Sequence, residues 1–92
     1  MTKAERDFQA RVRDAGCLVC TKLGNPGTPG EIHHCRKNGG RRDLCEMKVI
    51  SLCRTHHVEL HANRRNYDAL YGFTEIELMQ ETFAEHGEKV AA

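Results

Sequence analysis

Side chains that can bind metal ions are crowded into the middle of this chain. All 5 cysteines and five of the 6 histidines lie between residues 17 and 61 of a 92-residue sequence. A chain of this size buries only about 60% of the surface that its unfolded form exposes, so its apolar core is small. Aromatic residues make up only 5% of the chain, which limits that core further. These features predict a single domain over residues 1–92 that needs a metal or disulfides for stability.

The cysteines are expected to bind a metal rather than to form disulfides. Their number is odd, and residues 1–7 contain no apolar segment that would direct secretion. No run of about 18 apolar residues is present, so no membrane association is expected. We therefore expect a cytoplasmic protein whose thiols stay reduced. The alternative is that the cysteines are buried as small apolar side chains without a metal.

Local patterns predict a small α+β fold. Thr2 with Glu5, and Thr74 with Glu77, match the capping box that precedes a helix. The segment 17–20 is too short for a helix or strand and is expected to form a metal-binding knuckle. The expected elements are a helix over 3–15, strands over 31–35 and 49–52 separated by a basic turn over 37–42, and helices over 56–62, 64–71 and 75–86.

The last two predicted helices carry more specific expectations. Asn63 is placed to cap the helix over 64–71. Ile76, Met79 and Phe83 form the apolar stripe by which the last helix is expected to face the core. Residues 87–92 follow that helix and are expected to fray.

Four residues form two matched metal-binding motifs. Cys17 and Cys20 are spaced Cys-x-x-Cys, and Cys53 and His56 are spaced Cys-x-x-His. Zinc accepts three thiolates and one imidazole as a closed tetrahedral site. We therefore predict that these four residues hold a structural Zn²⁺ ion. Cys45 is an alternative ligand, because 5 cysteines exceed the needs of one such site.

The remaining histidines of the cluster predict a second metal site. His57 and His61 are four residues apart and share one helix face, whereas His56 points about 100° away from His57. One of the adjacent His33 and His34 can complete this site, and the other can act as a general base on water. Neighbours on a regular strand face opposite ways, so both serve one site only if the strand twists or ends there. The alternatives are a surface role for His61 and a purely structural role for one of the adjacent pair.

These motifs follow one another in a recognisable order. They are Cys17-Leu-Val-Cys20, Ile32-His33-His34, Lys48-Val-Ile-Ser-Leu-Cys53-Arg-Thr-His56-His57, His61-Ala-Asn63, Tyr67-Asp-Ala-Leu-Tyr71-Gly72 and the segment from Glu75 to Leu78. The order resembles that of the HNH (ββα-metal) endonucleases, and more closely that of the phage Ref-type RecA-dependent nucleases. The resemblance covers residues 15–80.

The resemblance implies a metal-dependent DNA endonuclease that hydrolyses phosphodiester bonds. By position, His34 matches the general base, and His33, His57 and His61 match the ligands of a catalytic Mg²⁺, Mn²⁺ or Zn²⁺ ion. The implied fold is a zinc-stabilised ββα-metal finger, treble-clef-like and flanked by helices. A role in phage recombination, in the cytoplasm of a bacterium or of a phage-infected cell and with a RecA filament as partner, is also implied.

The sequence departs from the family pattern at three places: the central asparagine, the additional cysteines Cys35 and Cys45, and the N-terminal segment. Lys48 stands where the family usually has the asparagine that orients the general base, and Asn38 and Asn63 are candidate substitutes. Ref-type proteins also carry a basic N-terminal segment that contacts DNA and RecA, and nothing before Thr2 corresponds to it. Cys35, beside the adjacent histidines, is expected to be a small buried residue.

Basic residues gather in the middle of the chain although the net charge is only +1. This uneven distribution suggests a face for a polyanion such as DNA, and the alternative is an ordinary solvated surface. The candidates for contact with DNA phosphates are Arg36, Lys37, Arg41, Arg42, Lys48, Arg64 and Arg65.

Other functions compete with the nuclease. A non-catalytic zinc module that binds nucleic acid or protein needs only the four zinc ligands and leaves the other clustered histidines without a role. A zinc peptidase is disfavoured, because Glu59 lies one place late for the His-Glu-x-x-His motif. A cysteine-nucleophile enzyme is disfavoured, because no cysteine has a histidine partner outside the predicted metal sites.

Overall fold

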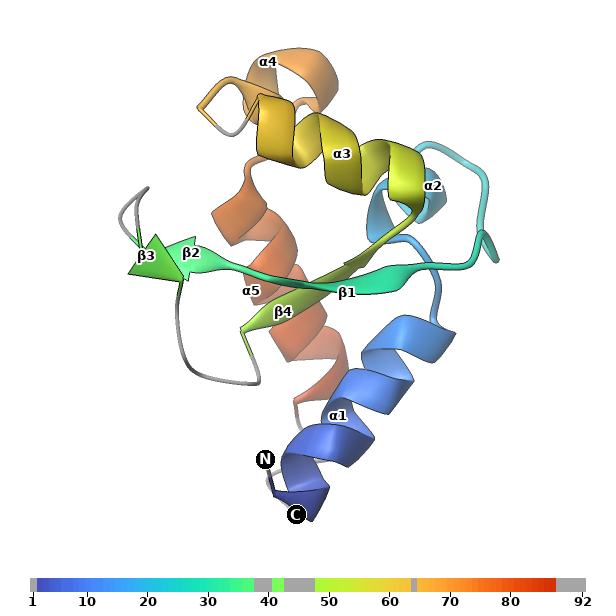
Figure 1. Cartoon of the computed structure of the whole chain (residues 1–92). Helices are drawn as coiled ribbons and strands as arrows, with labels where there is room; N and C mark the ends of the chain where they lie inside the picture. The colour runs from blue at the N-terminus through green and yellow to red at the C-terminus, as the bar shows by residue number, and fades with distance from the viewer. Residues whose placement is uncertain (1, 38–40, 43–47, 64, 88–92) are drawn as a thin grey trace.

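The chain folds into helices around a short antiparallel sheet, and the predicted α+β class is confirmed (Figure 1). The computed structural model describes residues 2–37, 41–42, 48–63 and 65–87, with the backbone alone at 36, 37, 41 and 42. The elements are α1 (Lys3–Asp14), α2 (Leu18–Lys22), β1 (Glu31–His34), β2 (Arg36–Lys37), β3 (Arg41–Arg42), β4 (Val49–Leu52), α3 (Arg54–Ala62), α4 (Tyr67–Tyr71) and α5 (Glu75–His86). None of these helices is long and apolar enough to cross a membrane.

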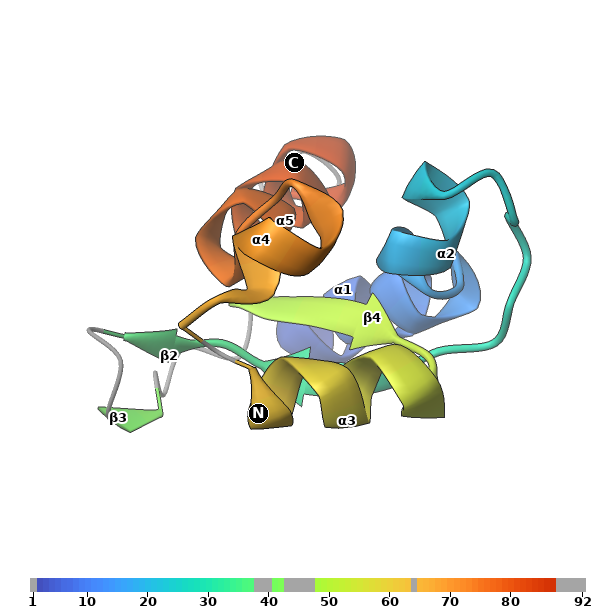
Figure 2. The same ribbon diagram turned by 90° about the horizontal axis from the view of Figure 1, so that it is seen from above.

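Strand β4 is the centre of the fold. It pairs antiparallel with β1, with His33 opposite Ile50 and Glu31 opposite Leu52, while β2 and β3 form a separate small pair. All four residues of β4 are buried, because helices pack on both of its sides. Seen from above, α3 and α5 lie on opposite sides of β4 (Figure 2). The two strands and α3 therefore form a ββα unit that α1, α2, α4 and α5 surround.

The predicted zinc ligands belong to the apolar core itself. Cys17 and Cys20 are buried in one cluster with Leu52, Leu60 and Tyr67. A smaller cluster joins α1 to β4 on the other side of the sheet. A metal held by these cysteines would thus tie the main core together.

Both predicted capping boxes are confirmed. The Thr2 side chain accepts a hydrogen bond from the Glu5 N–H at 3.1 Å, and the Glu5 carboxylate accepts one from the Thr2 N–H at 2.7 Å. Thr74 and Glu77 form the same pair of hydrogen bonds at 3.1 and 2.9 Å. These bonds satisfy backbone donors that a helix leaves unpaired at its start, and so they define where α1 and α5 begin.

Several predicted boundaries are wrong. Helix α3 begins at Arg54 rather than at residue 56, and the predicted basic turn over 37–42 includes β3 and the end of β2. The segment expected to be only a knuckle contains the short helix α2, which Cys17 caps through a hydrogen bond from the Cys20 N–H. Helix α4 begins at Tyr67 rather than at residue 64, and Asn63 instead ends α3. The side-chain amide of Asn63 donates a hydrogen bond to the Glu59 carbonyl at the end of α3. From the sequence alone, an asparagine that ends one helix looks the same as one that caps the next. Of the predicted frayed end, Gly87 follows α5, and residues 88–92 lie outside the described residues.

The predicted apolar stripe of α5 is also wrong. Ile76 and Phe83 are about half exposed, at 55% and 50%, although the Phe83 ring meets that of buried Phe8, and Met79 packs against the main core. The buried residues of α5 are Glu75, Leu78, Thr82 and His86. These four positions also recur at helical spacing, and three of them are polar. Hydrophobicity alone therefore selected the wrong face of this helix.

Two alanine substitutions distinguish these faces of α5. We expect Leu78→Ala, at a fully buried site, to lower the free energy of unfolding by about 2–5 kcal/mol through cavity formation. Ile76→Ala removes a side chain that is 55% exposed, so its effect should stay within about 0.5 kcal/mol. Urea unfolding of the zinc-loaded proteins measures both values. A larger loss for Ile76→Ala than for Leu78→Ala would mean that α5 docks by the face predicted from the sequence.

Candidate metal centre

The four predicted zinc ligands converge from two distant parts of the chain. Cys17 and Cys20 flank the start of α2, Cys53 caps α3, and His56 lies in the first turn of α3. Their donor atoms all lie within 4.8 Å of one another. The sheet strands β1 and β4 separate the two motifs in sequence, so folding is required to assemble the group.

The distances within this group match a tetrahedral ion. His56 Nδ1 lies 3.4 Å from the Sγ atoms of Cys17 and Cys20 and 3.3 Å from that of Cys53. Cys20 Sγ and Cys53 Sγ are 3.8 Å apart. Tetrahedral zinc with its usual bond lengths sets its ligand atoms about 3.6 Å apart for sulfur and nitrogen and about 3.8 Å apart for two sulfurs. The residues therefore fit a metal ion such as zinc in a closed, structural site.

The protonation of the thiols differs across the group. Burial raises the pKa of the Cys17 thiol to about 11. Burial acts in the same direction on Cys53, but hydrogen bonds from the backbone N–H of His56 and from the neighbouring thiols outweigh it, so the pKa of Cys53 is lowered. Zinc binds thiolates, so an ion entering the group would displace these protons.

Aromatic and acidic side chains support His56 from outside the group. The Tyr71 hydroxyl donates a hydrogen bond to Glu59 Oε1 at 2.6 Å, and this carboxylate oxygen lies 3.9 Å from His56 Nε2. The Tyr71 ring meets the His56 ring edge-on, with ring centroids 5.4 Å apart. The hydrogen bond to Glu59 raises the pKa of Tyr71 to about 12. Such contacts restrict the rotation of a metal-binding imidazole.

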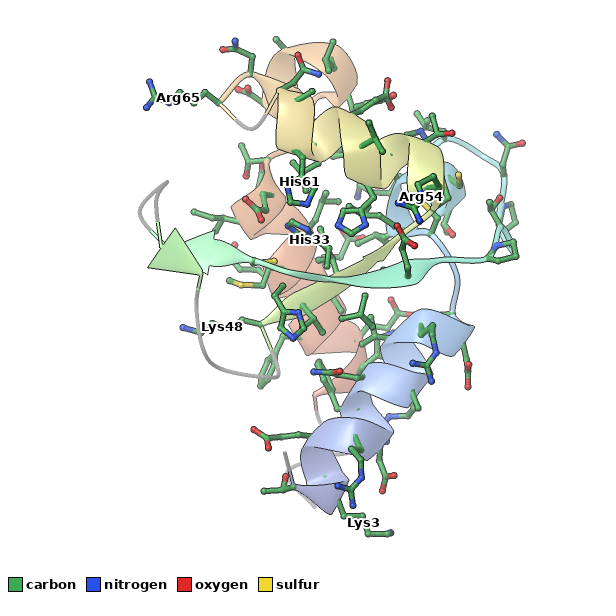
Figure 3. The ribbon with its side chains drawn as sticks, in the orientation of Figure 1. Lys3, His33, Lys48, Arg54, His61 and Arg65 are labelled. Carbon is green, nitrogen blue, oxygen red and sulfur yellow. The ribbon has the colours of Figure 1, made fainter. Side chains whose placement is uncertain are left out.

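Three further histidines form a second group, on β1 and α3 (Figure 3). The donor atoms of His33, His57 and His61 lie within 4.8 Å of one another. His33 Nδ1 and His57 Nε2 are 3.1 Å apart, and two imidazole ligands of one tetrahedral ion would be about 3.3 Å apart. His33 is buried, His57 is half-buried and His61 is exposed, so the group lies at the edge of the core and opens toward solvent.

Two of these histidines contact carboxylates through their other ring nitrogens. His33 Nε2 lies 2.6 Å from Glu75 Oε2, and His57 Nδ1 lies 2.8 Å from Glu31 Oε1. The hydrogen bond with His57 lowers the pKa of Glu31. Histidine ligands of metals usually donate their second N–H in this way, which sets the tautomer and the ring orientation. The arrangement of His33 and His57 thus has the form of a metal site with its supporting shell.

The adjacent His34 lies on the other face of the sheet from His33. The ladder between β1 and β4 is regular through both residues, so their side chains alternate. Ile32, which shares the face of His34, packs on the α1 side of the sheet, whereas His33 meets α3. The described metal-binding groups do not include His34. The sequence left open whether both histidines reach one site, and the regular strand places them on opposite faces.

The predicted basic residues are placed only in part. Lys48 is half-buried and Arg65 is exposed. The side chains of Arg36, Lys37, Arg41 and Arg42 lie outside the described residues, and so do Arg64 and Cys45. Cys35 is 2% exposed and belongs to the main core, as expected.

Sequence reasoning missed the carboxylates around the two histidine-containing groups. Glu31 could have been found, because it lies two residues before His33 and so shares its face of the strand. Tyr71 lies in one of the motifs that carry the family resemblance, but no pattern indicated that it or Glu59 would contact His56. Glu75 gave a misleading signal, because an acidic residue in the first turn of a helix is ordinary surface chemistry.

Comparison with known proteins found no relative of this chain. No protein-family model matches the chain, and no curated protein or solved structure matches it either. The assignment of function therefore depends on the site itself.

The two buried cysteines Cys20 and Cys35 provide a matched test of the first group. We expect Cys20→Ala to lose the tightly held zinc, because it removes one of four ligands. Cys35→Ala should retain one zinc per chain, because Cys35 is outside that group. Metal analysis after dialysis against a mild chelator measures both. Zinc retained in Cys20→Ala and lost in Cys35→Ala would reverse the ligand assignment.

Proposed function

We propose that this protein is a metal-dependent DNA endonuclease of the HNH (ββα-metal) type. The observation that carries the proposal is the pair of metal-binding groups that share helix α3. His56 belongs to the Cys/His group and the next residue, His57, to the three-histidine group. A closed site beside an open one is the division between structural and catalytic metals. The ββα arrangement of β1, β4 and α3 supports the same family.

The three-histidine group supports hydrolysis more than simple binding. His33, His57 and His61 would hold a divalent ion and leave positions for water and a phosphate oxygen. An ion there would polarise the phosphodiester and stabilise the charge that develops during hydrolysis. An all-imidazole donor set favours Zn²⁺ over Mg²⁺ and Mn²⁺, which prefer oxygen ligands. Glu31 and Glu75 hold two of the rings in place.

His34 is the proposed general base. Because His33 and His34 face opposite sides of β1, a substrate must lie across the edge of the strand to meet both residues. There His34 would accept the proton of the attacking water while its neighbour helps to hold the ion. Lys48 comes directly before β4, whose first residue Val49 pairs with His34. A lysine here provides a positive charge for a phosphate in place of the family's asparagine.

Two of the predicted DNA-contacting residues lie on one side of the three-histidine group. In the view of Figure 3, Arg65 projects to the left above His61, and Lys48 lies to the left below His33. Contacts of such residues with phosphates give binding that depends on salt and not on sequence. We therefore propose DNA as the substrate. It would approach the protein from the side of α3 and the edge of β1. The involvement of a RecA filament is proposed from the family resemblance alone.

Nicking of supercoiled plasmid at low salt tests this function. With Mn²⁺ or Zn²⁺ added, the wild type should nick the DNA, and His34→Ala should lower the rate by about 10²-fold or more while still binding a second ion. His57→Ala should lose both the cleavage and the second ion. Val58→Ala, on the exposed face of the same helix, should behave as wild type.

An absence of cleavage would mean either that the protein needs a RecA filament or that it is not a nuclease. A further assay with RecA distinguishes these two cases. If neither Mg²⁺, Mn²⁺ nor Zn²⁺ supports nicking, the assay is repeated with RecA filaments on the DNA. Cleavage that appears only then supports a RecA-dependent nuclease. No cleavage in either arm, with DNA still bound and one zinc retained, would contradict the nuclease and favour a non-catalytic zinc module.

A further inference from the structure

Glu75 is a buried acid in a position where an apolar side chain is expected. It is the first residue of α5 and is only 9% exposed. A carboxylate in such a place is costly unless it is paired. Its Oε2 atom lies 2.6 Å from Nε2 of His33, which is itself 3% exposed. The start of a helix also favours negative charge, so α5 stabilises the carboxylate that contacts the histidine.

The contact determines which ring nitrogen of His33 can bind a metal. When the Nε2–H donates to Glu75, the proton is on Nε2 and the lone pair is on Nδ1. That Nδ1 atom is the one that lies 3.1 Å from His57 Nε2. We propose that Glu75 is a positioning residue for the three-histidine site, holding His33 in the tautomer that binds through Nδ1. The inference rests on the metal site of the proposed function.

The contact distance argues for positioning rather than direct coordination. Donor atoms of His33, Cys35 and Glu75 also lie within 4.8 Å of one another, so Glu75 could itself be a ligand. Two ligands of one tetrahedral ion with nitrogen and oxygen donors lie about 3.3 Å apart. The observed 2.6 Å is instead the length of a charge-assisted hydrogen bond. Glu75 therefore acts through His33, and it places part of the site's support on the last helix.

Titration of the zinc-loaded protein with Co²⁺ tests this role, with visible absorption as the readout. The protein first receives one equivalent of Zn²⁺, which fills the Cys/His group. We expect Glu75→Ala to weaken binding of the second ion by about 10–100-fold, the usual effect of losing such a support. Glu75→Gln keeps an acceptor oxygen and should be weakened less. Glu77→Gln removes a charge from the same helix turn but keeps the capping box, and should bind as wild type.

A spectroscopic signature separates positioning from general loss of structure. Long-range ¹H–¹⁵N spectra of the protein without a second ion should place the His33 proton on Nε2 in the wild type and in Glu77→Gln. In Glu75→Ala the ring should become a mixture of tautomers. At saturation, the Co²⁺ bands of Glu75→Gln should keep their wild-type positions, because the ligands themselves are unchanged.

Three results would overturn the inference, each recognisably. Equal affinity for Co²⁺ in wild type and Glu75→Ala would remove the positioning role. Shifted Co²⁺ bands in Glu75→Gln would make Glu75 a ligand instead. A wild type that binds no second ion would remove the three-histidine site, and the proposed function with it. If the wild type binds the ion but cuts no DNA, the function fails while the role of Glu75 is still decided by the titration.

Discussion

The fold brings together four donor atoms from two segments that the sheet strands separate in sequence. Cys17 and Cys20 at α2 and Cys53 and His56 at α3 bring together segments that the β1–β4 hairpin separates in sequence. In a chain of 92 residues the apolar core alone is small. The free energy of metal binding becomes free energy of folding in such a site, because the unfolded chain does not hold the ligands together. The two cysteines at α2 are buried in the main core, so a metal bound there would add its free energy of binding to that of the apolar core.

Helix α3 connects the Cys/His group to the three-histidine group. Successive residues of a helix point about 100° apart, so His56 and His57 face different groups while their backbones are joined. A helix whose first turn is anchored at one site presents His57 and His61 in a defined direction to His33 on β1. The geometry of the open group is therefore a consequence of the closed one. A metal in the Cys/His group would therefore also fix the geometry of the three-histidine group.

The open group also determines which face of α5 is buried. Burial of Glu75 is acceptable because its carboxylate is hydrogen-bonded to the His33 ring, and burial of Thr82 because its hydroxyl donates to the Leu78 carbonyl at 2.8 Å. Ile76 and Phe83 stay about half exposed. Glu75 and Thr82 thus pack inward because their polar groups find partners there, whereas Nδ1 of buried His86 has none among the described residues. The packing of α5 therefore affects both the stability of the fold and the position of His33.

Short spacings in the sequence were enough to predict the local elements of this protein and its candidate metal ligands. Capping boxes, the two strands, the α+β class and the two groups of metal-binding residues all follow from patterns a few residues long. Three features depend on packing between distant segments and could be read only from the folded structure. They are the inward face of α5, the start of α4, and the carboxylates beside His33 and His57. Short motifs predict which side chains share a face, because helix and strand geometry is local. Which face is buried, and which acid meets which histidine, depends on contacts such as that between Glu75 and His33, 42 residues apart.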